Sequence, residues 1–372
     1  MKTKIIFAIV IISFISMLIT CNKNKEKMNE INIGVLLPLT GNLATYGNSA
    51  KEGIDLAVSS INETAKIKIV THFEDTRGLP KDAVNAYLKL KSNVYNLFAI
   101  LGPQTSSEVL SIAPICEKDK MVLLSHAASS PQISDAGDYI FRNVPSDYYE
   151  AVVLANFIID STKYKDIAVL FINDDYGNGV VSKFSNELTK RGGKIVSSIS
   201  YNANSTDFKT QLTKIKSFNP HAIYIIGFKE LGHIVKQTKE LNINVQIYSN
   251  ALFEDPDILK VAGSSANNVI FTTFYFDTES ENPRIKEFIK QYKSKYNKIP
   301  DGFAATAYDA VFLLYASAIN STNSEQLKNK LIKISGFPGL LGNLTFDSKG
   351  DITLPIQLKT VKNNNFINLN NK

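Results

Sequence analysis

Two clusters of small hydroxyl residues are candidates for chemistry, because each follows directly after an apolar, strand-like run. The first run, 97–101, breaks at Gly102-Pro103 and leads into Thr105-Ser106-Ser107. The second run, 121–124, leads into the polar segment 125–131, SHAASSP. A helix that begins at Ser106 would direct its unpaired backbone N–H groups and the positive end of its dipole toward the carboxyl edge of a parallel sheet. That arrangement suits the carboxylate of a small ligand.

Both clusters also have a purely structural interpretation. Thr105 and Glu108 have the spacing of a capping box, in which a hydroxyl and a carboxylate bind the free N–H groups at a helix start. Segment 125–131 would then be an ordinary loop. Two such clusters at the ends of neighbouring runs favour a binding site over either structural interpretation alone.

The N-terminus has the pattern of an export signal. Lys2 and Lys4 precede an apolar stretch, 5–19, which is shorter than the about 20 residues that a spanning helix needs. Cys21 resembles the lipidated cysteine of bacterial lipoproteins, although Thr20 departs from the usual Gly or Ala. We therefore expect a signal peptide over 1–20, lipidation at Cys21, and a polar linker over 21–30. The alternative is an uncleaved membrane anchor. Either way, the expected location is the periplasmic or cell-surface side of the membrane.

Composition and motifs exclude several classes of function. The chain has 372 residues, 44% of them hydrophobic and 20% charged, which is typical of a soluble globular protein with room for two domains. Its net charge of +6 comes from basic residues scattered among acidic ones, so no nucleic-acid partner is indicated. The sequence contains no HExxH, no GxSxG and no phosphate loop, and its four histidines have no metal-ligand spacing. We predict a protein that is not an enzyme and needs no cofactor or metal.

The elements that must position the two clusters are strands that alternate with helices. From residue 31 apolar runs alternate with helical patterns three times, and the alternation restarts after Pro145. Helices expected at 283–296, 302–319 and 325–334 bring no new long strands, so we expect them to return to the first unit. The predicted fold is α/β, with two doubly wound parallel-sheet lobes joined by a multi-strand hinge. Lobe 1 is assigned to residues 31–146 plus 277–335, and lobe 2 to 147–276 plus 336–368.

Several short motifs occur in an order and at separations that a known family shares. The chain resembles the type 1 periplasmic binding proteins, above all the leucine/isoleucine/valine-binding proteins of ABC importers. The resemblance extends over residues 31–365, and the stretches that carry it include 33–41 (IGVLLPLTG), 142–147 (RNVPSD), 175–177 (DYG) and 307–311 (AYDAV).

The resemblance implies roles for particular residues. Ser106 and its neighbouring backbone would bind the α-carboxylate of the ligand. Ser129 and the backbone of Ala127 would share the carboxylate and ammonium groups. From the opposite lobe, Tyr176 would lay its ring over the ligand and Asp147 would face the ammonium. The structural alternatives are a packed turn aromatic for Tyr176 and a helix N-cap for Asp147.

Two further positions concern the rest of the ligand. Tyr46 lies where the family has a first-lobe aromatic that borders the side-chain pocket. Asn250 stands where importers and receptors of the family usually carry an acid against the ammonium, and the loss of that acid removes a charge-assisted bond of about 1.5 to 3 kcal/mol. Three explanations stay open: Asp147 supplies the countercharge, Glu254 moves in, or the ligand lacks an α-amino group.

The resemblance implies a substrate-binding lipoprotein of an ABC importer. Such a protein would capture a small amino acid, branched-chain or otherwise apolar, by hinge closure, and pass it to an ABC permease in the inner membrane. We expect a monomer, tied to the membrane through lipid on Cys21. The alternatives are a ligand-sensing lipoprotein of the same fold, a binder of a non-amino-acid carboxylate or amide, and, from a different class, a hydrolase.

Overall fold

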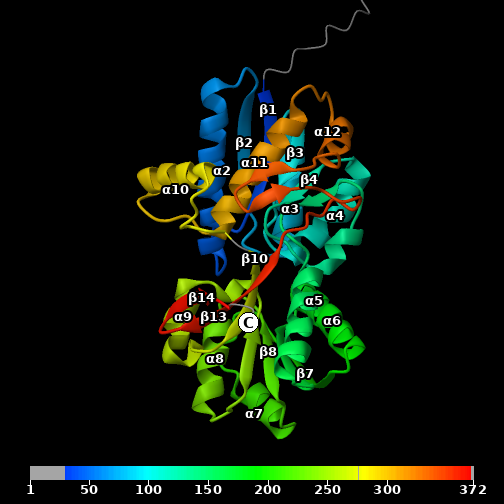
Figure 1. The fold of residues 1–372 in the computed structure, drawn as a ribbon. Helices are drawn as coiled ribbons and strands as arrows, with labels where there is room; N and C mark the ends of the chain where they lie inside the picture. The colour runs from blue at the N-terminus through cyan, green and yellow to red at the C-terminus, as the bar shows by residue number, and fades with distance from the viewer. Residues whose placement is uncertain (1–29, 275, 370–372) are drawn as a thin grey trace, which may run out of the picture.

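The computed structural model describes residues 30–274 and 276–369, so the predicted signal peptide, Cys21 and most of the linker lie outside the described residues. The described chain forms two lobes (Figure 1). Within these residues, no helix combines the length and apolar character needed to cross a bilayer.

Lobe 1 is built on a five-stranded parallel sheet in the order β2-β1-β3-β4-β5. Alternate residues of the strands pack on opposite faces, because side chains in a strand point to the two sides in turn. Ile33 and Val35 pack with α2 and with the later helices α10–α12, whereas Leu36 packs with α3 and α4. The strands are β1 (Glu30–Leu37), β2 (Lys68–Asp75), β3 (Leu97–Leu101), β4 (Leu123–Ser125) and β5 (Ile140–Arg142). The helices are α2 (Ala44–Thr64), α3 (Pro80–Asn93), α4 (Ser106–Asp119), α10 (Pro283–Tyr296), α11 (Gly302–Ala318) and α12 (Ser324–Leu331).

Lobe 2 contains a seven-stranded sheet in the order β14-β13-β10-β9-β8-β6-β7. Its first five strands in sequence are parallel, and the two C-terminal strands add to its edge in antiparallel fashion. The strands are β6 (Asp166–Ile172), β7 (Lys194–Tyr201), β8 (Ala222–Ile226), β9 (Gln246–Ser249), β10 (Ile270–Phe274), β13 (Ile356–Lys362) and β14 (Asn365–Asn368). The helices are α5 (Asp147–Phe157), which continues as a π-helical turn (Ile158–Thr162), α6 (Asp175–Lys190), α7 (Lys209–Ser217), α8 (Leu231–Glu240) and α9 (Pro256–Ala262).

The chain passes between the lobes at three places, after β5, after β10 and before β13 (Figure 1). The fold class predicted from sequence is confirmed, and helices α10 to α12 do return to lobe 1. The predicted boundary at residue 336 is wrong. The hairpin of β11 (Phe337–Gly339) and β12 (Gly342–Leu344) packs into the lobe 1 core through Leu340 and Leu344, and only β13 and β14 join lobe 2. The hairpin forms a separate two-stranded sheet, and its buried leucines, Leu340 and Leu344, hold it against lobe 1.

The crossings are tied together by a buried ion pair. Arg142, at the end of β5, is fully buried and donates from Nε and Nη2 to the two carboxylate oxygens of Asp351, at 2.7 and 2.8 Å. Next to it, Pro145 and Phe346 both form bridges with Ile352. Two of the three connections therefore run side by side and are fixed to each other.

Candidate functional site

The first wall of the site is the carboxyl edge of β3 and the start of α4. Thr105 and Glu108 form the predicted capping box: the Glu108 N–H donates to Thr105 Oγ1 at 3.3 Å, and the Thr105 N–H donates to a Glu108 carboxylate oxygen at 2.9 Å. The structural interpretation therefore holds for these two residues. Ser106 is outside the box. Its buried Oγ accepts a hydrogen bond from the Ser130 N–H at 3.1 Å, and its own proton stays available to donate.

The bond from Ser130 joins the two hydroxyl clusters, as the sequence predicted. Ser125 holds the second cluster in place: its Oγ donates to the Pro103 carbonyl at 2.8 Å and accepts from the Ala128 N–H at 3.0 Å. Ala127, whose N–H also points to the Ser125 hydroxyl, and Ser129 are both half-buried. Segment 125–131 therefore lies beside the start of α4, and the Ser125 hydroxyl holds its backbone in place.

The second wall begins with Asp147, the first residue of α5. The structural interpretation of Asp147 as a helix cap is wrong, because the cap is Ser146, whose Oγ accepts from the Tyr148 N–H. The Asp147 N–H donates to the Ser129 carbonyl at 2.9 Å, which places the acid against the first wall. Its side chain is buried, and among the described residues Oδ2 has no hydrogen-bond partner. Burial raises the pKa of this carboxyl, while the Ser129 hydroxyl and, less strongly, Arg142 act to lower it.

Tyr176 and Asn250 continue this second wall. Asp174 caps α6 and accepts from the Gly177 N–H at 2.8 Å, which fixes Tyr176 in the first turn of the helix. Asn250, which follows β9, donates from Nδ2 to Tyr176 Oη at 2.6 Å and to the Gly227 carbonyl at 3.2 Å. Both side chains are buried. The Asn250 amide is therefore used to hold the tyrosine.

Tyr46 makes a further connection between the lobes. It lies in the first turn of α2, and its Oη donates to Asp255 Oδ2 of lobe 2 at 2.9 Å. Its ring packs on Phe303 with a centroid separation of 4.9 Å, and Lys229 Nζ lies 5.1 Å from the ring centroid. Burial and the neighbouring Asp255 raise the pKa of its hydroxyl.

The lobes also meet directly between α4 and α6. The Asp175 N–H donates to Ser107 Oγ at 3.3 Å, and Ser130 Oγ donates to the Asp175 carbonyl at 3.2 Å. A Cβ added at Gly179 would lie 2.6 Å from Ser130 Oγ, so a larger residue there would require the Ser130 side chain to shift. With these contacts formed, the predicted site residues are buried or half-buried between the lobes.

Some residues of this region were missed by sequence reasoning. Gln104 lies between β3 and Ser106; it is 6% exposed, and among the described residues neither atom of its amide has a partner. Glu150 is buried one helical turn after Asp147, and Phe228 packs on Tyr176 at a centroid separation of 5.4 Å. The spacing of Asp147 and Glu150 in the sequence was a usable signal, because residues three apart share a helix face.

Glu254 does not take the place of the acid absent at Asn250. It forms an ion pair with Lys359, and it accepts a hydrogen bond from Thr273 Oγ1 at 2.9 Å. Of the three explanations for Asn250, the movement of Glu254 therefore requires this ion pair to break.

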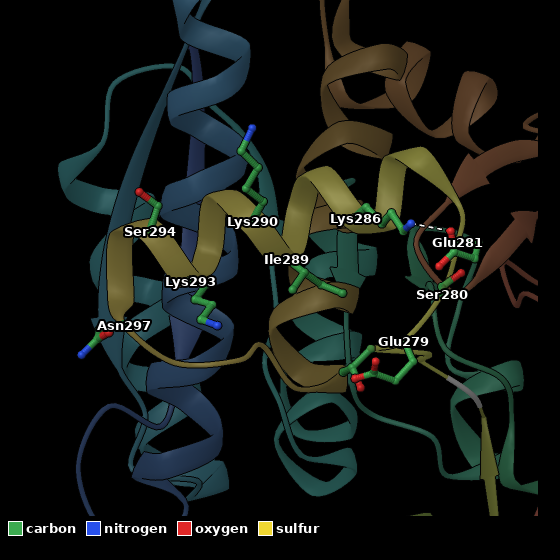
Figure 2. A pocket seen from close by; sticks show the side chains of 10 residues that line it. Glu279, Ser280, Glu281, Lys286, Ile289, Lys290, Lys293, Ser294 and Asn297 are labelled. Carbon is green, nitrogen blue, oxygen red and sulfur yellow. Dashed lines mark hydrogen bonds and ion pairs between the residues drawn. The ribbon is translucent and has the colours of Figure 1, made fainter.

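A hollow of about 700 Å³ lies beside α10 and the crossing segment at 278–281, and none of the candidate site residues lines it (Figure 2). Lys286 turns back to pair with Glu281, and Lys290 and Lys293 leave the helix in different directions. Because its charged groups do not converge, this hollow is a poor ligand site. In the described part of the chain, no cluster of three or more His, Cys, Asp or Glu side chains has the arrangement of a metal site.

Comparison with known proteins agrees with this architecture. The profile of the family described as periplasmic binding protein matches residues 30–364. Leu/Ile/Val-binding protein homolog 3 of Brucella melitensis is 26% identical over 334 residues, which cover 88% of this chain and 89% of that protein.

Two solved structures show the same fold. The leucine-binding protein LivK from Thermotoga maritima has a TM-score of 0.84 and 28% identity, covering 91% of this chain and 98% of its own. The branched-chain amino acid transporter substrate-binding protein LivJ from Streptococcus pneumoniae, in complex with isoleucine, has a TM-score of 0.82 and 27% identity, covering 91% and 97%. The chain belongs to the periplasmic binding protein family, with the fold of its type 1 members.

Proposed function

We propose that this chain captures a small amino acid between its lobes as the substrate-binding protein of an ABC importer. The observation that carries the proposal is Asp147 Oδ2, a buried carboxylate oxygen without a partner among the described residues, at the place where the two lobes meet. A buried acceptor without a donor is unfavourable by about 1 to 3 kcal/mol. The α-ammonium of an amino acid supplies that donor, while Ser106, Ser129 and the start of α4 suit its carboxylate.

Hinge closure gives this binding its effect. The hydrogen bonds from Tyr46 to Asp255 and from Asp175 to Ser107 each join one lobe to the other, so they exist only when the lobes are together. A ligand that touches both walls favours the closed state over the open one. A permease that recognises the closed state would then receive the loaded protein.

The ligand and its site are tested by calorimetry on the purified mature protein. We expect heat of binding and a raised melting temperature with L-leucine, L-isoleucine, L-valine or another small apolar amino acid. The double variant Ser106→Ala, Ser129→Ala should lose both effects, while Ser111→Ala should keep them. Ser111 is the matched control because it lies on α4 but bonds to the Pro80 and Glu108 carbonyls. Unchanged binding by the double variant would overturn the site.

The anchor is tested separately. We propose lipidation of Cys21, which would hold the folded lobes at the membrane beside the permease. Cys21→Ser should move the protein from the membrane fraction to the soluble fraction without changing ligand binding. Recovery of wild-type and variant protein in the same fraction would refute the lipid anchor and leave the ligand site untouched.

A carboxylate that lacks an amino group is the second candidate ligand, and Asn250 favours it, because this position offers no acid to an ammonium. The two candidates separate when L-leucine is compared with its deaminated analogue, 4-methylpentanoate. An amino-acid site should bind leucine more tightly, since the analogue leaves Asp147 without its donor. Tighter binding of 4-methylpentanoate would replace the first proposal with the second.

A further inference from the structure

Glu150 lies one turn after Asp147 on the same face of α5, and both residues are only 3% exposed. One Glu150 oxygen, Oε2, accepts from Thr272 Oγ1 of β10 at 2.7 Å. The charge of each acid raises the pKa of the Tyr176 and Tyr224 hydroxyls, and the charge of Asp147 raises the pKa of Glu150. The two carboxyl groups therefore occupy one buried region of lobe 2, on the side where Asp147 bonds to the Ser129 carbonyl of lobe 1.

Buried carboxylates require a compensating cation or a proton. Within the described part of the chain, Arg142 is the one cation whose charge lowers the pKa of either acid, and it does so for Asp147. It is already committed, because Asp351 takes its Nε and Nη2 groups, Ser130 accepts from Nη1 at 2.7 Å, and Ser134 accepts from Nη2 at 2.7 Å. Arg142 and Asp351 neutralise each other, so two acids remain without a counterion.

The other groups that face the pair are hydroxyls or backbone N–H groups. Three of them donate hydrogen bonds that favour an ionised carboxylate: the Ser129 hydroxyl, the Thr272 hydroxyl of β10 and the Ala251 N–H after β9. The Tyr176 hydroxyl accepts from Asn250, and the Tyr224 hydroxyl has no hydrogen-bond partner among the described residues. None of these groups brings a charge.

We propose that Asp147 and Glu150 act as one unit, which holds a single proton in the ligand-free protein and exchanges it for the cationic nitrogen of the ligand. The proton leaves for solvent as the ammonium approaches the unpartnered Asp147 oxygen. Glu150 is a positioning residue in this scheme, because it acts on the ligand through Asp147. This inference rests on the proposed function and explains how an ammonium site works without an acid at position 250.

The direction of the pKa shifts agrees with this proton exchange. Burial raises the pKa of both carboxyls, and the neighbouring Asp147 raises that of Glu150 further. A cation beside Asp147 has the opposite effect, since it favours both ionised forms. Ligand binding and proton release are therefore linked.

The test is calorimetric titration of the mature protein with L-leucine near pH 7, in phosphate and in Tris, whose different ionisation heats report the protons released. We expect net proton release and an affinity that rises with pH, by up to about tenfold per pH unit. Glu150→Gln should still bind leucine but should release fewer protons and have a flatter pH profile. Thr272→Val should move the pH at which affinity levels off upward, because the ionised Glu150 loses a donor. Glu187→Gln, on the outer part of α6, is the control and should match wild type.

Leucine binding without proton release and with equal affinity from about pH 5 to pH 8 would overturn the inference and leave the proposed function standing. Binding of no amino acid at any pH would overturn the proposed function instead.

The shared proton is tested separately in the ligand-free protein, by carbon NMR of labelled Asp and Glu carboxyl groups. A pair that shares a proton must show two coupled titrations that collapse to one in Glu150→Gln. Two independent titrations in the ordinary carboxyl range would refute the shared proton.

Discussion

Restoring an acid at position 250 should harm this protein. Asn250→Asp looks like a repair, because the resemblance to importers and receptors places an acid there. In this structure, however, the Asn250 side chain is a donor: Nδ2 binds Tyr176 Oη at 2.6 Å and the Gly227 carbonyl at 3.2 Å. Aspartate has no N–H. The Tyr176 hydroxyl is able to rotate and donate to the new carboxylate. The Gly227 carbonyl is only an acceptor, so it loses its hydrogen bond.

The size of the loss follows from these contacts. A buried carbonyl left without its donor reduces the free energy of unfolding by about 1 to 3 kcal/mol. The new carboxylate would also be a third acid near Asp147 and Glu150, both of which are buried. Desolvation and like charge would raise its pKa in the folded state above that in the unfolded state. The stability that its protonated form retains at low pH is lost as pH rises through the folded pKa, so the deficit should be larger at pH 8 than at pH 5.

The measurements are chemical denaturation at both pH values and calorimetry with L-leucine. Asn250→Ala is the matched control, because it removes the same two hydrogen bonds without adding a charge. Its deficit should be similar at pH 5 and pH 8, whereas that of Asn250→Asp should grow, and Asn250→Asp should bind leucine more weakly than wild type. If Asn250→Asp is instead as stable as wild type at pH 8 and binds leucine more tightly, the ammonium reaches position 250. That result would refute the claim that a third acid beside Asp147 and Glu150 is unfavourable.

Three further outcomes are expected. Tyr46→Phe removes the bond to Asp255, so the closed state should lose about 1.5 kcal/mol and the dissociation constant for leucine should rise about tenfold by calorimetry. Gln104→Leu should raise the free energy of unfolding of the ligand-free protein by about 1 to 3 kcal/mol in urea denaturation, because it removes a buried amide with no partner among the described residues. Burial raises the pKa of Asp309 to about 7, so its contribution to stability is lost as pH rises through that value; Asp309→Asn should lessen the fall in melting temperature between pH 5 and pH 8.

The strands and their order along the chain were predictable, because each buried parallel strand is a short apolar run between helical patterns. β3 occupies 97–101 as predicted, and the alternation restarts after Pro145 as predicted, with helix α5 at Asp147–Phe157. β5 was missed, since a three-residue strand at 140–142 has too few side chains to set a period. The return to lobe 2 was placed too early for a different reason: which core receives a hairpin depends on contacts that the local pattern does not contain.

The position of the hydroxyl half of the candidate site was predictable from local pattern, because Ser106 and Ser129 follow strand ends that a parallel sheet brings to one edge. The structure connects the two clusters through the Ser130 N–H and the Ser106 hydroxyl, and the binding role of these residues stays a prediction. The capping box at Thr105 also holds, so the two interpretations of that cluster apply to neighbouring residues.

The acid half was less predictable because it depends on charge balance, which is a property of the folded chain. In the sequence, Arg142 stands five residues before Asp147, and in the structure its charge acts to lower the pKa of that carboxyl. In the fold, Arg142 is bound by Asp351, which is 209 residues away in sequence. That pairing offsets the charge of Arg142, so the proposed function assigns the neutralisation of Asp147 and Glu150 to a proton or to a cationic ligand. If the proposal is correct, the distant ion pair at the hinge favours a ligand that brings a cation.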